Sequence, residues 1–184
     1  RTGRRGDRFH PALTICETSG RVSMQQDYKI GNGSVDLHRA IIEQAPEAII
    51  FSDRDGAIRL WNGGAETVFG HTADEALGQS LDIIIPERLR RAHWDGFNHA
   101  ISTGQQKYVN RVLTTRSMHK NGAKLYVDLS FALVRDEAGA VVGALAVGRD
   151  CTARYLADGA LRARLNELEE KAKGGIKGNE GPTA

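Results

Sequence analysis

The sequence predicts an α+β domain in which short helices cover one face of a five-stranded antiparallel sheet, followed by a C-terminal amphipathic helix. Three observations predict this class. Two strand patterns form a hairpin near the start, three longer strand patterns follow residue 107, and short helical segments lie between them. With 184 residues, 40% of them hydrophobic and 26% charged, the chain is large enough for one packed core.

The first predicted helix covers residues 37–45, where apolar side chains recur at helical spacing and Asp36 stands at the N-cap. A hairpin follows it. Residues 48–52 are rich in β-formers and residues 58–62 alternate between apolar and polar, with an Asp-Arg-Asp-Gly turn between them. This pattern predicts two antiparallel neighbours.

Three helices are predicted next. Residues 64–69 and 72–77 are short and each is followed by glycine, which takes the left-handed conformation that ends many helices. A longer helix over 87–102 begins after Pro86 and ends at Gly104.

The last three strands are predicted over 107–119, 124–134 and 141–147, joined by turns that contain glycine. The middle strand alternates clearly, and its apolar residues share one face: Leu125, Val127, Leu129, Phe131 and Leu133. Tight turns make the three strands consecutive antiparallel neighbours.

The two ends of the chain differ in composition from this domain. Residues 1–36 are rich in Gly, Ser, Arg and Gln without periodicity, and residues 174–184 are rich in glycine, so we expect a disordered segment and a flexible tail. Residues 153–173 form an amphipathic helix with a nearly heptad apolar stripe: Ala157, Leu161, Leu165, Leu168 and Ala172. The stripe favours a homodimer, and the alternative is a helix folded back on its own sheet.

Several functional classes are not supported by the sequence. The two cysteines do not form a disulfide framework or a zinc motif, and no catalytic motif of the common enzyme classes is present, so we expect no enzyme activity. The longest apolar run is far too short for a transmembrane helix or a signal peptide. The excess positive charge lies in the first 23 residues, which gives no basic face for nucleic acid. These features predict a cytoplasmic protein without nucleic-acid or membrane partners.

Residues 37–152 resemble a PAS sensory domain. The motifs that carry the resemblance occur in order and at the family's spacing: Asp53-Arg54-Asp55-Gly56, Trp61-Asn62, Phe69-Gly70, Glu75-Ala76-Leu77-Gly78, Ile85-Pro86-Glu87, Lys120-Asn121-Gly122 and Gly148-Arg149-Asp150-Cys151-Thr152. Cys151 departs from the aliphatic residue usual before the final threonine. The resemblance implies a five-stranded PAS fold and a sensor or signal-relay module that works through dimer rearrangement on a downstream signalling protein.

The resemblance also bears on the cofactor. Flavin-based light sensors of the family carry a reactive cysteine after the segment that corresponds to Gly78-Gln79-Ser80, and here no cysteine follows it. A flavin thiol adduct is therefore excluded. A reversibly bound redox flavin, another small molecule, or a cofactor-free dimerisation or protein-interaction module remain alternatives.

The helix over 87–102 is similar to that of FixL-type haem oxygen sensors, whose iron-ligating histidine corresponds to His93. His93 lies four residues from both Leu89 and Phe97, so the three side chains share one helical face. An imidazole on an apolar face suits iron, so we expect haem b with His93 as its metal ligand.

The strands are expected to supply the rest of this pocket. The expected lining residues are apolar side chains from the three later strands: Leu113, Leu129, Phe131, Leu145 and Val147. Leu113 stands where the oxygen sensors have a distal arginine, so bound dioxygen would lose a charge-assisted hydrogen bond. The resemblance therefore implies a diatomic gas ligand less dependent on that bond, such as CO or NO, or a redox role.

Overall fold

The computed structural model describes residues 28–30 and 33–176 of the chain. It divides the chain into two units, residues 1–37 and 38–184. In the first unit, β1 (Tyr28–Ile30) pairs antiparallel with β2 (Gly33–Val35). This pair departs from the predicted disorder of residues 1–36, because β-forming side chains flank a Gly-Asn turn dipeptide in the sequence. Residues 1–27 lie outside the described part.

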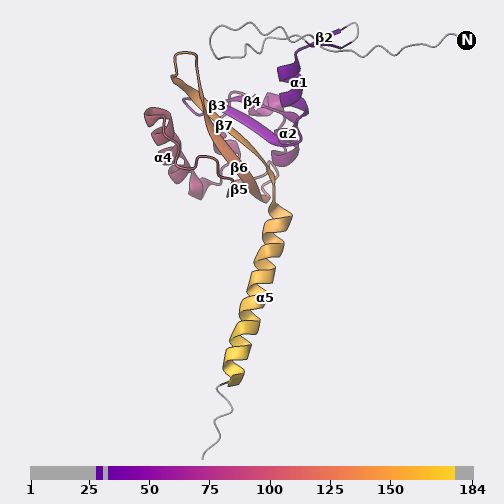
Figure 1. Ribbon diagram of the computed structural model, residues 1–184, viewed down its shortest axis with the longest axis vertical. Coiled ribbons are helices and arrows are strands. Elements are labelled where there is room, and N and C mark those ends of the chain that lie inside the picture. Colours follow the sequence, from indigo (N-terminus) through magenta and orange to yellow (C-terminus); the bar gives the residue numbers. More distant parts are fainter. Residues whose placement is uncertain (1–27, 31–32, 177–184) are drawn as a thin grey trace, which may run out of the picture. The chain divides into compact units, whose positions relative to one another are not determined.

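The second unit holds an antiparallel sheet of five strands in the order β4-β3-β7-β6-β5 (Figure 1). Its strands are β3 (Ala48–Asp53), β4 (Ile58–Trp61), β5 (Leu113–Met118), β6 (Lys124–Arg135) and β7 (Val141–Asp150). The helical segments are α1 (Leu37–Gln44), α2 (Gly63–Phe69), α3 (Ala73–Ala76), η1 (Leu81–Ile83), α4 (Glu87–Thr103) and α5 (Thr152–Ile176). The predicted α+β class and the predicted PAS-type sheet are confirmed.

The strand predicted over 107–119 begins only at Leu113. Asn110 has a φ of 54°, in the left-handed region that breaks an extended chain. The preceding segment is solvent-exposed, including the apolar side chains of Tyr108, Val109 and Val112. Apolar composition alone therefore extended the predicted strand too far toward its N-terminus.

Strand alternation gives the sheet two different faces. On one face, which we call the inner face, the side chains of Ile50, Val127 and Leu129 join the buried core beneath α2 and α3. The pairs Leu129↔Gly148 and Phe131↔Ala146 place the even-numbered residues of β7 on this inner face. The other face, the outer face, carries Tyr126, Asp128 and their cross-strand neighbours.

Asn62 fixes the hairpin to the preceding helix. Its buried side chain is the N-cap of α2, where Oδ1 accepts hydrogen bonds from the backbone N–H groups of Ala65 and Ile49. Its Nδ2 donates to the carbonyls of Ile42 and Glu47, at 2.9 and 3.0 Å. One amide thus satisfies backbone groups at the end of α1, in β3 and at the start of α2, which would otherwise be buried without partners.

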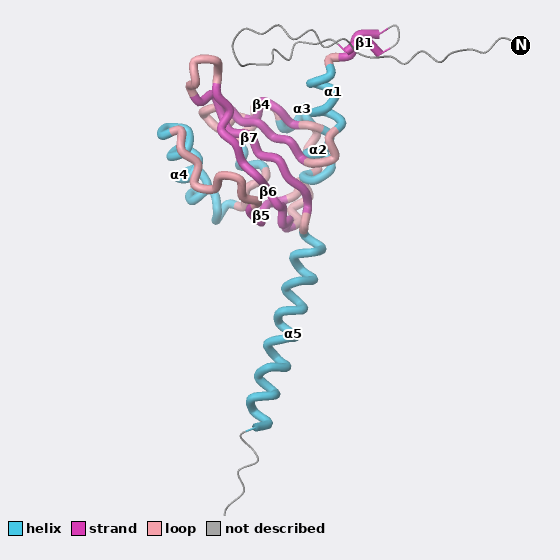
Figure 2. Tube along the Cα trace, viewed as in Figure 1, coloured by secondary structure: helices cyan, strands magenta, loops and turns pink. Residues whose placement is uncertain are grey.

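Helix α5 continues from the end of β7 and is longer than the predicted 153–173, because residues 174–176 are helical too. The predicted flexible tail beyond residue 176 lies outside the described residues. Leu161, Leu165 and Leu168 are 69%, 56% and 50% exposed, so the stripe does not pack on its own sheet (Figure 2). The fold-back alternative is therefore contradicted. In the described part of the chain, none of the helices combines the length and the hydropathy that crossing a membrane requires.

Candidate functional site

His93 lies in the middle of α4, on the helical face that the sequence predicted. Its imidazole is half-buried and packs against two neighbouring aromatic rings of the same helix. The ring centroids lie 6.0 Å from Phe97, in a stacked arrangement, and 5.0 Å from Trp94, edge to face. His99, on the opposite side of the helix, is exposed. The four-residue spacing therefore identified the desolvated histidine correctly.

Trp94 and Arg90 attach this helix to the preceding segment. The Trp94 indole N–H donates to Oδ1 of Asp82 at 2.9 Å, and its six-membered ring lies against Gly56 in the β3–β4 turn. Arg90 donates to the carbonyls of Asp82 and Ile85 and forms a 3.6 Å ion pair with the Asp82 carboxylate. These contacts hold the N-terminal half of α4, which carries His93, against η1 and the β3–β4 turn.

Burial changes the acid–base behaviour of His93. Desolvation lowers the pKa of the imidazole, and the negative charge of Asp82 opposes this only in part. The ring is therefore neutral at physiological pH, which is the form that ligates a metal.

His93 Nδ1 is buried and has no hydrogen-bond partner. A buried polar atom without a partner costs roughly 1–3 kcal/mol, so its presence calls for an explanation. Within the described ranges, no three His, Cys, Asp or Glu side chains gather closely enough to hold a free ion. A neutral imidazole among apolar side chains is a donor that haem iron accepts from a protein.

The predicted lining residues fall into two groups, one on α4 and one on the inner face of the sheet. Leu89 and Phe97 flank His93 on α4 and are half-buried. On the sheet, Leu113 pairs with Leu129, and both lie on the same inner face as Phe131. Leu129 is buried, whereas Phe131 is 37% exposed, so the apolar layer on the α4 side of the sheet is incompletely packed.

Leu145 and Val147 do not belong to this group. The pairs Ala132↔Leu145 and Ser130↔Val147 place both side chains on the outer face, so the prediction that they line the pocket is wrong. Both alternating sets of β7 are apolar or small, and the sequence therefore left the face undecided. The inner positions of β7 hold the small residues Ala144, Ala146 and Gly148.

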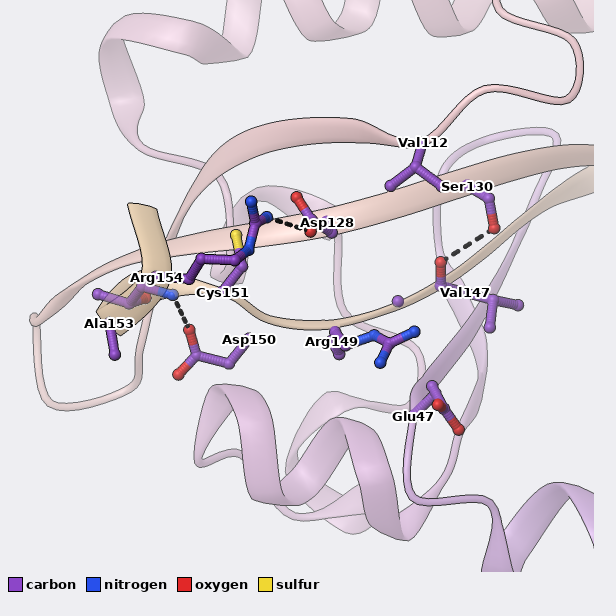
Figure 3. A pocket seen from close by; sticks show the side chains of 12 residues that line it. Glu47, Val112, Asp128, Ser130, Val147, Arg149, Asp150, Cys151, Ala153 and Arg154 are labelled. Atoms are coloured by element: carbon purple, nitrogen blue, oxygen red, sulfur yellow. Dashed lines mark hydrogen bonds and ion pairs between the residues drawn. The ribbon is translucent and has the colours of Figure 1, made fainter. Parts of the chain in front are cut away.

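A concave feature lies on the outer face, where β7 meets α5 (Figure 3). It is an open groove of about 690 Å³. The charged side chains that line it are Glu47, Asp128, Arg149, Asp150 and Arg154. This groove is on the opposite side of the sheet from the inner-face residues, and sequence reasoning missed it because its lining comes from separate strands and the start of α5.

Comparison with known proteins decides the family. A family model described as the PAS fold matches residues 36–151, more than half of the chain. The chain belongs to the PAS family. The sequence-based interpretation of residues 37–152 as a PAS sensor or signal-relay module is thereby confirmed.

Two relatives of this PAS chain are named sensors. It is 33% identical over 81 residues to the sensor protein FixL of Bradyrhizobium diazoefficiens, which is 44% of this chain and 14% of FixL. It is 26% identical over 111 residues to the oxygen sensor protein DosP of Escherichia coli, covering 60% of this chain and 14% of DosP. The PAS chain thus spans about a seventh of each relative.

Solved structures agree with the fold. The PAS domain of a protein from Colwellia psychrerythraea superposes with a TM-score of 0.56 at 23% identity. The match covers 63% of this chain and 95% of that domain. At this identity the likeness supports the PAS fold alone.

Proposed function

We propose that this PAS chain is a haem-based sensor in which His93 would hold the iron of haem b. The observation that carries the proposal is the desolvated, neutral imidazole of His93 beside the aromatic side chains of α4. The similarity to FixL, and to DosP with its named oxygen-sensing role, supports the same assignment.

Each residue of the site then has a defined task. His93 would hold the iron, and the Trp94–Asp82 and Arg90–Asp82 contacts would keep the imidazole in place by fixing the helix. Leu89, Phe97, Leu113, Leu129 and Phe131 would exclude water from the ring faces. When bound, haem would supply an iron coordination position for a diatomic gas or for electron transfer.

Leu113 determines the preference among gases in this proposal. Its side chain lies on the inner face of β5 and carries no hydrogen-bond donor, so dioxygen would receive no charge-assisted hydrogen bond from this position. We therefore expect CO or NO to bind well relative to dioxygen. We propose that ligand binding leads to signal transfer and not to catalysis. The cytoplasmic location of the protein stays a prediction.

The cofactor is tested by absorption spectroscopy of the full chain purified with haem supplied. A Soret band is expected for the wild type and for His99→Ala, which removes an exposed histidine from the same helix. His93→Ala should lose the band or shift it strongly. An unchanged band in His93→Ala, or no band in the wild type, contradicts the proposal and favours the cofactor-free, flavin or small-molecule alternatives.

We propose further that α5 pairs with α5 of a second copy and passes the signal to a downstream protein. The support is the exposed stripe formed by Leu161, Leu165 and Leu168, because a stable helix rarely leaves such a row in water. Glutamine at these three positions should convert a dimer to a monomer in light scattering. Leu156→Gln, an exposed leucine off the stripe, should leave the dimer intact, and a monomeric wild type would contradict the proposal.

A further inference from the structure

The root of α5 is joined to strand β6 by more than the covalent chain. The backbone N–H of Cys151 donates to the Tyr126 carbonyl at 2.8 Å, and the Tyr126 N–H donates to the Thr152 hydroxyl at 2.9 Å. These bonds fix the point at which the helix leaves the sheet. They lie at one place on the helix, so by themselves they leave its direction free.

Two side chains of the first turn then meet the outer face. The Tyr155 ring stacks on Tyr126 with centroids 3.8 Å apart and an interplanar angle of 16°. The Arg154 guanidinium donates to Oδ2 of Asp128 at 2.6 Å (Figure 3). Tyr126 and Asp128 are two residues apart on the same face of β6, and Arg154 and Tyr155 are about 100° apart around the helix axis.

Tyr126 and Asp128, which we call the anchors because they hold α5, are themselves held by β5. Arg116 donates to the Tyr126 hydroxyl at 3.0 Å, with its guanidinium carbon 5.4 Å from the ring centroid. Thr114 donates to Oδ1 of Asp128 at 2.6 Å. Hydrogen bonds from Thr114 and the Arg154 charge lower the pKa of Asp128, so the carboxylate is ionised at neutral pH. The anchors therefore present fixed geometry to the helix.

We propose that Tyr126 and Asp128 of β6, with Arg154 and Tyr155 of α5, form a clamp that sets the tilt and rotation of α5 relative to the sheet. Two contacts at different angles around the axis restrain both motions, which one contact cannot do. Past the clamp the helix is open to solvent, since Leu156 is 58% exposed. The direction of the stripe on α5 is thus decided within its first turn.

The clamp also connects the two faces of the sheet. Val127 and Leu129, on the inner face, alternate along β6 with the clamp residues Tyr126 and Asp128. Any displacement of β6 that starts at the inner face moves both anchors, and through them the helix. This relay role rests on the proposed function, whereas the mechanical role of the clamp does not.

The test measures the spread of α5 directions in the full chain. Spin labels on cysteines introduced at the exposed positions Glu137 and Glu169 report the distance from the β6–β7 turn to α5. All samples carry Cys16→Ser, and labelled chains are diluted with unlabelled chains so that only distances within one chain count. Haem loading and dimerisation are not needed, so the result is independent of the proposed function.

The double variant Arg154→Gln/Tyr155→Leu should broaden the distance distribution by about twofold, because an unclamped helix samples several directions. Arg164→Gln is the matched control, since it breaks the exposed Arg164–Glu167 ion pair of the same helix away from the clamp. It should leave the distribution unchanged. Equal widths in wild type and double variant, or equal broadening in the control, overturn the proposal.

A second variant guards against loss of folding. Asp128→Asn keeps the shape and the capacity to accept from Thr114 but removes the ionic half of the clamp. It should broaden the distribution less than the double variant, and adding Arg154→Gln should change it no further. A folded Asp128→Asn chain with a wild-type distribution shows that the ion pair plays no part and contradicts the clamp as proposed.

Discussion

The inner and outer faces of the sheet are built from the same strands but by different rules. Along β6 from Leu125 to Phe131, every second residue is apolar and lies on the inner face, whereas the residues between them carry phenol, carboxylate and hydroxyl groups. Packing on the inner face stabilises the fold by removing apolar area from water, whereas hydrogen bonds and an ion pair on the outer face orient α5. One strand can therefore sense on one side and position a helix on the other.

The largest expected difference between the faces is in folding stability. Leu129→Ala on the inner face should lower the free energy of unfolding by about 2–5 kcal/mol, because it leaves a cavity in the packed layer. Ser130→Ala, the next residue but on the outer face and exposed, should change it by less than about 0.5 kcal/mol. Urea unfolding followed by circular dichroism measures both, and similar losses would show that the faces do not differ in this way.

The next effect concerns ligand space. Ala146→Leu adds three carbon atoms to the inner face opposite Phe131, so it should reduce haem binding by about tenfold or more while the chain still folds. The neighbouring substitution Leu145→Ala acts on the outer face and should leave haem binding unchanged. Haem titration followed by absorption gives both affinities, and a loss confined to Leu145→Ala would reverse the assignment of the faces.

The smallest effects are in pH dependence, and the two faces should respond in different windows. The lowered pKa of His93 means that the unfolded chain binds a proton more readily, so stability falls as pH drops below about 6.5. His93→Gln should flatten the melting temperature between about pH 7.5 and 5.5. If the melting temperature of this variant changes with pH as steeply as that of the wild type, His93 is not the source of the pH dependence.

Asp128 has the opposite relation between charge and stability. Its lowered pKa means that the carboxylate stabilises the fold above the unfolded-state pKa near 3.9 and loses this contribution as pH falls through the lower folded-state value. Asp128→Asn should therefore change the melting temperature at neutral pH but converge with wild type in strong acid. Parallel curves at all pH values would contradict this account.

Most of the fold could be predicted from local signals. Alternation in β6, the glycine turns and the glycine after α4 predicted the sheet and its connections, because each reflects backbone conformation within a few residues. The histidine followed from helical spacing in the same way. These features need no knowledge of distant residues.

The missed features depend on pairing between distant segments. The face on which Leu145 and Val147 lie is decided by register with β6, and both alternate sets of β7 were apolar enough to fit. The outer-face groove and the stacking of Tyr155 on Tyr126 join residues from different strands and α5. The left-handed Asn110, which delays β5, has only a weak signal in composition.

The position of β7 in the centre of the sheet has a consequence for how the chain is made. Its partner β3 leaves the ribosome first, yet Ala48 pairs with Gly148, so the hairpin of β3 and β4 waits for strand residues made 100 positions later. At about 5–20 residues per second, this interval is roughly 5–20 s. During this interval, the edge of β3 that later pairs with β7 exposes unpaired backbone groups that can bind another nascent chain. Any shortened chain that stops before β7 keeps this edge permanently open and is expected to aggregate.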